Sequence, residues 1–177
     1  MVTPLAHIER AARVKVMIFD VDGVLTDGSL TYGPDGEATK TFFVLDGLGI
    51  QLLRKTGVQT AIISARRSPI VVRRAADLGI DHVYQGQHDK RLAFAELLAA
   101  TGAAPDECGY IGDDVIDLPL FARVGFAVTV PSGHPEVQHR AHYVTTNPGG
   151  RGAVREVCDM VMRAQGRYEQ ALAPYFG

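Results

Sequence analysis

Two kinds of hydrophobic pattern alternate along the chain. Short, nearly continuous apolar runs are typical of strands buried on both faces of a sheet, and the segments between them have apolar residues at helical spacing. The expected strands are 14–19, 59–64, 82–85, 108–113, 125–130 and 142–145. The expected helices are 49–55, 70–78, 90–101 and 117–123, with a last helix at 152–169 and a tail to residue 177. Strands that alternate with single helices predict an α/β fold, a Rossmann-like parallel sheet sandwiched by helices.

One segment, 28–44, breaks this alternation. Residues 29–32 and 39–44 are rich in residues that favour strands, and Gly33-Pro34-Asp35-Gly36 between them is typical of a turn. The segment therefore predicts an inserted β-hairpin. Because a two-stranded hairpin is only marginally stable in water, we expect it to pair with another element, and a second subunit is a reasonable candidate.

Composition and charge are those of an ordinary globular protein and exclude several kinds of partner. The 177 residues, 46% hydrophobic and 21% charged, fit a single domain that spans 1–177. The net charge of −2 gives no general attraction to nucleic acid or to an anionic membrane. The sequence has no apolar run of membrane-span or signal-peptide length, and only two cysteines, Cys108 and Cys158. We therefore expect a cytoplasmic protein.

The first expected strand runs directly into two carboxylates, Asp20 and Asp22. Side chains two positions apart on a strand point to the same side, so this pair would meet at the carboxyl end of the sheet, where open α/β sheets bind ligands. Adjacent carboxylates repel each other unless a cation or a shared proton lies between them. The pair therefore indicates a divalent metal ion, with one carboxylate left to attack an electrophile. Taken alone, Asp-x-Asp is more often an acidic turn.

Later segments supply the other parts of a phosphoryl-transfer site. Ser64 ends the second expected strand with a hydroxyl, Lys90 begins a helix with an ammonium group, and Asp113 follows the fourth strand with a further carboxylate. Phosphoryl transfer needs such a set, because a metal and a lysine offset negative charge while positioned donors hold the transferring group. The sequence thus predicts an enzyme that transfers phosphoryl groups.

These motifs and their order resemble the haloacid dehalogenase superfamily of aspartate-nucleophile phosphatases. The matching residues are Asp20-Val21-Asp22-Gly23-Val24-Leu25-Thr26, Ser64, Lys90 and Gly112-Asp113-Asp114-x-x-Asp117. The resemblance implies that Asp20 attacks phosphorus and becomes an aspartyl-phosphate, while Asp22 protonates the leaving oxygen and then activates water. It implies Mg²⁺ held by Asp20, the backbone carbonyl of Asp22, and Asp113. Asp117 would support these ligands, and Asp114 is a candidate to orient Lys90.

A closer resemblance, over nearly the whole chain, is to the 3-deoxy-D-manno-octulosonate 8-phosphate phosphatases. It rests on 20–28, the hairpin, 43–50, 84–86 and the glycine-rich 149–156, which is its most discriminating part. It implies release of phosphate from this eight-carbon sugar acid phosphate in lipopolysaccharide precursor synthesis. The substrate-binding residues that it implies are Asp22, Val44, Leu45, Asp46, Gly47, Arg66, Arg74 and Lys90.

Two positions depart from that pattern. Leu45 and Gln51 stand where the family often has arginine. Each lost cation weakens the binding of a sugar-acid carboxylate by about 1–3 kcal/mol if the contact is buried and charge-assisted. A nine-carbon nonulosonate phosphate or another small sugar phosphate is therefore the alternative substrate. A hypothesis of a different class, an inactive oligomerisation or regulatory domain, is opposed by the intact motifs.

The intervals between the motifs leave no room for a cap domain. The hairpin and one helix fill most of the chain between Asp20 and Ser64, and one helix and one strand fill the stretch from Ser64 to Lys90. An uncovered site admits bulk water and discriminates poorly between substrates. We therefore expect neighbouring subunits to close it through the hairpin and the C-terminal tail around Arg151. The resemblance implies a homotetramer with active sites at subunit interfaces.

Overall fold

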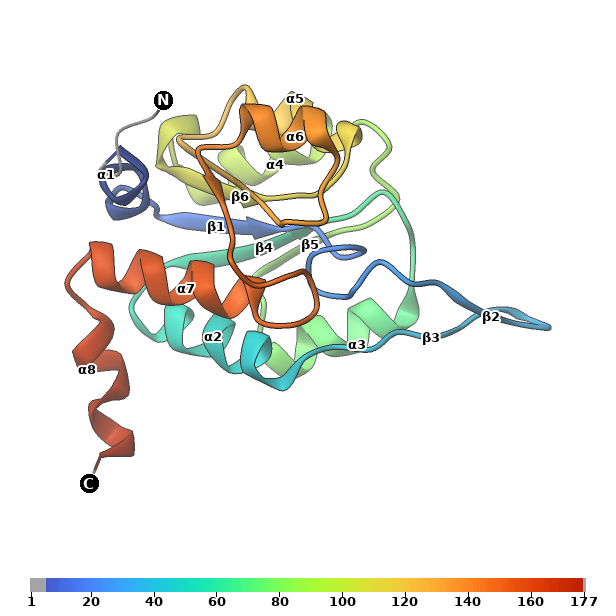
Figure 1. The fold of residues 1–177 in the computed structure, drawn as a ribbon, viewed down its shortest axis with the longest axis horizontal. Coiled ribbons are helices and arrows are strands. Elements are labelled where there is room, and N and C mark those ends of the chain that lie inside the picture. Colours follow the sequence, from blue (N-terminus) through green and yellow to red (C-terminus); the bar gives the residue numbers. More distant parts are fainter. Residues whose placement is uncertain (1–5, 177) are drawn as a thin grey trace.

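The computed structural model describes residues 6–176, so residues 1–5 and 177 of the predicted domain lie outside the described residues. A sheet of six parallel strands forms the centre of the molecule (Figure 1). Its strands are β1 (Val16–Phe19), β4 (Gln59–Ile63), β5 (His82–Tyr84), β6 (Cys108–Ile111), β7 (Phe126–Thr129) and β8 (Tyr143–Val144). Their order, β5-β4-β1-β6-β7-β8, confirms the predicted Rossmann-like sheet.

Helices cover both faces of this sheet (Figure 1). One face carries α1 (Ala6–Ala12), α2 (Val44–Lys55), α3 (Pro69–Leu78) and α7 (Ala153–Ala164), and the other carries α4 (Lys90–Thr101), α5 (Leu118–Phe121) and α6 (Pro135–Arg140). Side chains of β1 alternate between the two faces of the sheet. Met17 and Phe19 pack in the hydrophobic cluster beneath α2 and α7, and Val16 and Ile18 pack in the cluster beneath α4 and α5. Because β1 is buried on both faces, its sequence is continuously apolar.

The inserted hairpin is present but shorter than predicted. β2 (Thr31–Gly33) and β3 (Gly36–Thr39) pair antiparallel around the Pro34-Asp35 turn and extend away from the sheet (Figure 1). The predicted second strand at 39–44 is wrong, because β3 ends at Thr39 and α2 already begins at Val44. The predicted start of that helix at Gly49 is therefore also late.

The C-terminal segment differs from the prediction as well. α7 ends at Ala164, the chain turns through Gly166 with φ +66°, and α8 (Tyr168–Leu172) follows, so the single helix expected at 152–169 is wrong. The helix expected at 117–123 is a 3₁₀ turn, Val115–Asp117, followed by the short α5. Helices α1 and α6 are not among the predicted elements. No helix within residues 6–176 combines the length and the apolar character that crossing a bilayer demands.

The strand order decides where the chemistry lies. β1 is the central neighbour of both β4 and β6, so the residues that follow these three strands meet at one edge of the sheet. Asp20 and Ser64 come directly after β1 and β4, and Asp113 lies two residues beyond β6. Between β1 and β4 the chain forms only the hairpin and α2, which agrees with the prediction that there is no cap domain.

Candidate active site

Side chains at the carboxyl ends of β1, β4 and β6 line a cavity of about 230 Å³. The cavity contains the predicted Asp20, Asp22, Ser64, Arg66 and Asp113, together with Gly28, Ala65, Asp114 and Ile116. Asp20 and Ser64 are 6% and 3% exposed, so the side chains at the bottom of the cavity are almost fully shielded from solvent. Charged groups in such a place interact more strongly than they do in bulk water.

Lys90 is completely buried and lies behind Asp20, at the bottom of the cavity. Its Nζ is 2.9 Å from Asp20 Oδ2, 2.6 Å from Asp117 Oδ1 and 2.8 Å from the Tyr110 hydroxyl, so all three ammonium protons have acceptors. Burial alone would lower the pKa of Lys90, but the charges of Asp20 and Asp117 outweigh it and raise that pKa above its usual value. Lys90 is therefore a fixed positive charge directly behind Asp20.

Asp117, rather than Asp114, orients this lysine. Asp117 Oδ1 accepts from Lys90 and from the Tyr110 hydroxyl at 2.6 Å, and its Oδ2 accepts from the backbone N–H groups of Asp113 and Asp114. Asp114 instead accepts from the backbone N–H of Val115 at the start of the 3₁₀ turn. The suggestion that Asp114 orients Lys90 is wrong, because a local cap engages its carboxylate.

Three carboxylates approach one another closely enough to hold a metal ion: Asp20, Asp113 and Asp117. Asp117 already accepts four hydrogen bonds, so the carboxylates left for a cation are Asp20 and Asp113. Gly23, at φ +87°, brings its backbone against Asp113, where a Cβ would stand 2.0 Å from Oδ2. A side chain at position 23 would therefore displace the Asp113 carboxylate from its place near Asp20.

The electrostatics of Asp20 and Asp113 favour the binding of a cation. Burial, together with the charges of Asp20 and Asp117, raises the pKa of Asp113 to about 7. Burial also raises the pKa of Asp20 to about 7, although Lys90 opposes the shift. Two carboxylates that resist ionisation in the same small space are stabilised when a divalent cation takes the place of their protons.

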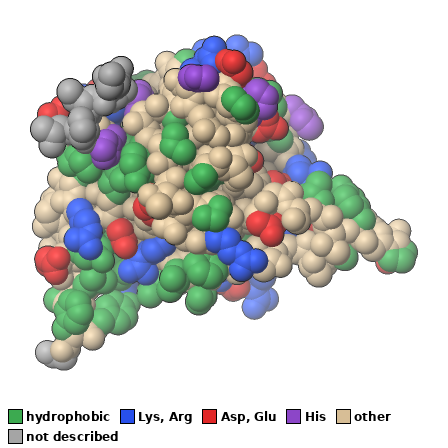
Figure 2. Space-filling view, viewed as in Figure 1, with side chains coloured by type: hydrophobic (Ala, Val, Ile, Leu, Met, Phe, Trp, Pro, Cys, Tyr) green, Lys and Arg blue, Asp and Glu red, His purple; other side chains and the backbone are tan. Residues whose placement is uncertain are grey.

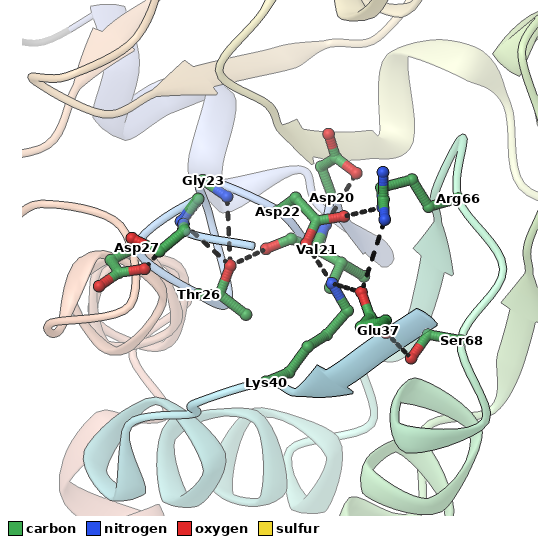
Figure 3. A network of polar contacts seen from close by, with 12 residues as sticks. Asp20, Val21, Asp22, Gly23, Thr26, Asp27, Glu37, Lys40, Arg66 and Ser68 are labelled. Carbon is green, nitrogen blue, oxygen red and sulfur yellow. Dashed lines mark hydrogen bonds and ion pairs between the residues drawn. The ribbon is translucent and has the colours of Figure 1, made fainter. Parts of the chain in front are cut away.

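Asp22 belongs to a second network, which the hairpin completes (Figure 3). Lys40, the residue after β3, donates to Asp22 Oδ1 and lies 2.8 Å from Glu37 Oε1. Glu37 also accepts from the Ser68 hydroxyl, and Arg66 Nε is 3.7 Å from Asp22 Oδ2. Sequence reasoning missed Glu37 and Lys40. Their only signal was a pair of charged residues within a segment otherwise rich in strand formers.

Comparison with known proteins places these features in a family. A family model described as haloacid dehalogenase-like hydrolase matches residues 76–156. The 3-deoxy-D-manno-octulosonate 8-phosphate phosphatase KdsC of Yersinia pestis is 49% identical over 164 residues, which are 93% of this chain and 88% of that protein. The chain belongs to the KdsC family of haloacid dehalogenase-like hydrolases. It is accordingly a phosphoric monoester hydrolase, as the sequence predicted, and not an inactive assembly domain.

Solved structures of KdsC proteins agree closely with this fold. The crystal structure of the Yersinia pestis phosphatase has a TM-score of 0.91 and covers 93% of this chain and 89% of its own. A Moraxella catarrhalis phosphatase of the same name, solved in complex with magnesium ion, phosphate ion and a KDO molecule, is 41% identical, with a TM-score of 0.94. That alignment covers 97% of this chain and 99% of the other.

The remaining residues predicted to bind substrate in this KdsC-family chain lie elsewhere. Asp46 is 1% exposed, and its carboxylate accepts from the backbone N–H of Gly152 at 3.3 Å and of Arg155 at 2.8 Å, so it holds the first turn of α7. Arg74, on α3, lies over the ring of Phe42. The predicted substrate residues that do not line the strand-end cavity include Lys90, which lies fully buried behind Asp20. The others are Val44, Leu45, Asp46, Gly47 and Arg74.

A larger cavity of about 690 Å³ shares none of its lining residues with the strand-end cavity. Leu45 lines it together with Phe43 and the arginines Arg151 and Arg155. Leu45 and the neighbouring Val44 are 47% and 73% exposed, which leaves this side of α2 open within one chain. Within a single described chain, the predicted substrate residues therefore fall into two groups.

Proposed function

We propose that this enzyme hydrolyses 3-deoxy-D-manno-octulosonate 8-phosphate to the free sugar acid and phosphate, with Mg²⁺ as its cofactor. The observation that carries the proposal is the buried Asp20, paired with Lys90 and adjacent to Asp113 at the strand ends. Near full-length similarity to KdsC phosphatases supports the substrate. We place the reaction in lipopolysaccharide precursor synthesis and in the cytoplasm, where two buried and unpaired thiols stay reduced.

The chemistry follows from the contacts of Asp20. Lys90 and the backbone N–H of Val21 hold this carboxylate in place, so one oxygen attacks phosphorus as the bond to the sugar oxygen breaks. Asp22 gives its proton to the leaving oxygen. It then takes a proton from the water that attacks the aspartyl-phosphate, which releases phosphate and restores Asp20. Ser64 faces the same cavity, where its hydroxyl can donate to a phosphoryl oxygen.

The residues that would hold Mg²⁺ are Asp20, Asp113 and the backbone carbonyl of Asp22. When bound, the ion supplies positive charge against the phosphoryl oxygens. Lys90 neutralises part of the remaining negative charge from the protein side, without itself being open to solvent. The positive charges of the ion and of Lys90 would together offset the negative charges of the carboxylates in this small cavity.

Recognition of the sugar acid needs more than this cavity offers. Arg66 lies at its rim and is a candidate for the substrate carboxylate or phosphate. Val44, Leu45, Asp46, Gly47 and Arg74 form the second group, and the exposed Val44 and Leu45 are accessible to a neighbouring chain. A homotetramer with active sites at subunit interfaces would bring the two groups together.

A phosphate-release screen tests the proposal. Purified enzyme with Mg²⁺ is given the octulosonate phosphate, a nonulosonate 9-phosphate and simple hexose phosphates, beside an Asp20→Asn control. We expect the highest kcat/KM for the octulosonate phosphate and no release by the variant. Equal turnover of hexose phosphates would contradict the substrate, and a nonulosonate preference would support the alternative that Leu45 and Gln51 suggest.

A further inference from the structure

Lys40 is a buried cation that the hairpin delivers to the active site. Its side chain is 1% exposed, and it contacts two carboxylates, Asp22 and Glu37. Burying an ammonium group is unfavourable unless acceptors replace its water, so Lys40 is held firmly where both carboxylates reach it. Glu37 in turn accepts a hydrogen bond from the Ser68 hydroxyl, and its Oε1 lies 3.8 Å from Arg66 Nη2 (Figure 3).

The two oxygens of Asp22 have different surroundings as a result. Oδ1 accepts a hydrogen bond from Lys40. Oδ2 faces Arg66 Nε at 3.7 Å, which is beyond hydrogen-bond distance, and that Nε is buried with no hydrogen-bond partner among the described residues. The Tyr32 hydroxyl accepts from Arg66 Nη2 at 2.9 Å, so the hairpin also fixes the arginine. Asp22 therefore has one oxygen that accepts a hydrogen bond and one that faces the charge of Arg66 without accepting a hydrogen bond within the described chain.

We propose that Lys40 is a positioning residue that fixes Asp22 through Oδ1 and reserves Oδ2 for proton transfer. This inference rests on the proposed function, in which Asp22 is the acid and then the base. The proton leaves Oδ2 for the sugar oxygen as its bond to phosphorus breaks. It is replaced on Oδ2 when water attacks the aspartyl-phosphate. The hairpin thereby serves its own subunit's chemistry, in addition to any role between subunits.

The test compares two leaving groups in Lys40→Met. A nitrophenolate departs from phosphorus without a proton, whereas a sugar alkoxide needs one, and kcat/KM reports only the steps up to the phosphorylation of Asp20. We expect kcat/KM for a primary sugar phosphate to fall roughly 100-fold, which is within the usual contribution of general acid catalysis. For p-nitrophenyl phosphate it should fall by less than about tenfold, and Lys40→Arg should recover most of the loss.

Two further variants complete the test. Glu37→Gln removes one partner of Lys40 and should show the same substrate selectivity in weaker form, even if Lys40→Met does not fold. Lys15→Met is the matched control, because Lys15 also pairs with a glutamate, Glu107, but at the opposite end of β1 from Asp20. It should leave both rates unchanged.

The outcomes separate this inference from the proposed function. Equal losses on both substrates in Lys40→Met and Glu37→Gln, or no loss on either, would overturn the role of Lys40 and leave the phosphatase intact. The test uses whichever primary sugar phosphate the wild type hydrolyses best, so it does not depend on the octulosonate. A wild type that releases phosphate from neither ester would contradict the proposed function itself.

Discussion

At the scale of single residues, Asp117 organises the site although it lies below the cavity. It is 0% exposed and connects the lysine behind the nucleophile to the loop that carries Asp113. A buried ion pair contributes little net stability compared with apolar packing, but removal of one member leaves the other charge without compensation. Asp117 is therefore needed for the fold as well as for the placement of Lys90.

Asp117→Ala should consequently destabilise the enzyme far more than Asp114→Ala. We expect the first substitution to lower the free energy of unfolding by about 3 kcal/mol or more, because Lys90 and two backbone N–H groups lose an acceptor. The second removes only a cap and should cost about 1 kcal/mol. Urea unfolding of both variants measures the difference, and equal effects would contradict the role given to Asp117.

The pKa values of Asp20 and Asp113 predict how Mg²⁺ binding depends on pH. Both are about 7 in the metal-free protein, so a cation must displace protons at pH 6 but hardly any at pH 8. We expect the apparent affinity to be at least about tenfold lower at pH 6 than at pH 8. Isothermal titration at both values measures this, and a pH-independent affinity would contradict the assignment of these ligands.

The raised pKa of Asp113 also determines how the stability of the metal-free protein changes with pH. The folded-state pKa of Asp113 lies above its unfolded value, so its protonated form stabilises the metal-free protein at low pH. This contribution is lost as the pH rises from about 4 through about 7. Stabilisation by added Mg²⁺ should therefore be greater at pH 8 than at pH 6.

At the scale of elements, the loop after β1 is held by the turn that precedes α7. The backbone N–H of Gly150 donates to the carbonyl of Val24 at 2.8 Å. A Cβ on Gly150, which has φ +66°, would lie 2.5 Å from the backbone of Thr26 and Asp27. The glycine-rich segment thus approaches the loop of the catalytic aspartates too closely for any side chain.

Gly150→Ala should therefore damage both stability and activity. Gly102 is the matched control, because it has a similar φ of +69° but nothing within 4 Å of a Cβ. Gly102→Ala should cost about 1 kcal/mol for the left-handed backbone alone. Gly150→Ala should cost roughly 1–3 kcal/mol more through the clash, and should lower kcat with Mg²⁺. If both variants unfold at the same urea concentration, the close approach of Gly150 to the loop after β1 does not contribute to stability.

The elements of the sheet were predictable because buried parallel strands are continuous apolar runs, whereas the start of α2 was not. Its first turns contain Gly47 and Gly49, which disfavour helix by sequence alone. In the structure a Cβ at these positions would lie 2.4 Å from Arg74 and 2.8 Å from Arg155. Close packing against α3 and α7 therefore overrides the low helix propensity of this segment.

Some residues of the site could likewise be predicted from the sequence, and others could not. Asp20, Ser64 and Asp113 were predictable as neighbours because each follows a strand, and parallel strands end at one edge. Lys40 was not, because no local pattern says in which direction a hairpin folds back on the sheet.

At the scale of the whole molecule, two exposed apolar regions project from the body. One is the hairpin region, where Leu30 and Tyr32 are 42% and 61% exposed, and the other is the tail, where Tyr175 and Phe176 are 55% and 74% exposed (Figure 2). Apolar side chains on projecting segments are common at interfaces between subunits. They support the proposed homotetramer, in which these segments meet neighbouring chains.

Light scattering at micromolar concentration tests the assembly. We expect a mass four times that of one chain. A Leu30→Arg variant should dissociate, because it would place a charge in the contact proposed between subunits. The dissociated variant should lose kcat/KM for the sugar acid phosphate. A wild-type monomer that retains full activity and selectivity would contradict the claim that subunits complete the site.

The central claim is that Asp20 becomes phosphorylated during turnover. The direct measurement is to quench the enzyme with borohydride while it hydrolyses its substrate, and to locate the reduced residue by peptide mass spectrometry. We predict conversion of the aspartyl-phosphate at position 20 to homoserine, in amounts that fall to nothing without substrate. Reduction at another residue, or continued turnover by Asp20→Asn, would contradict the account.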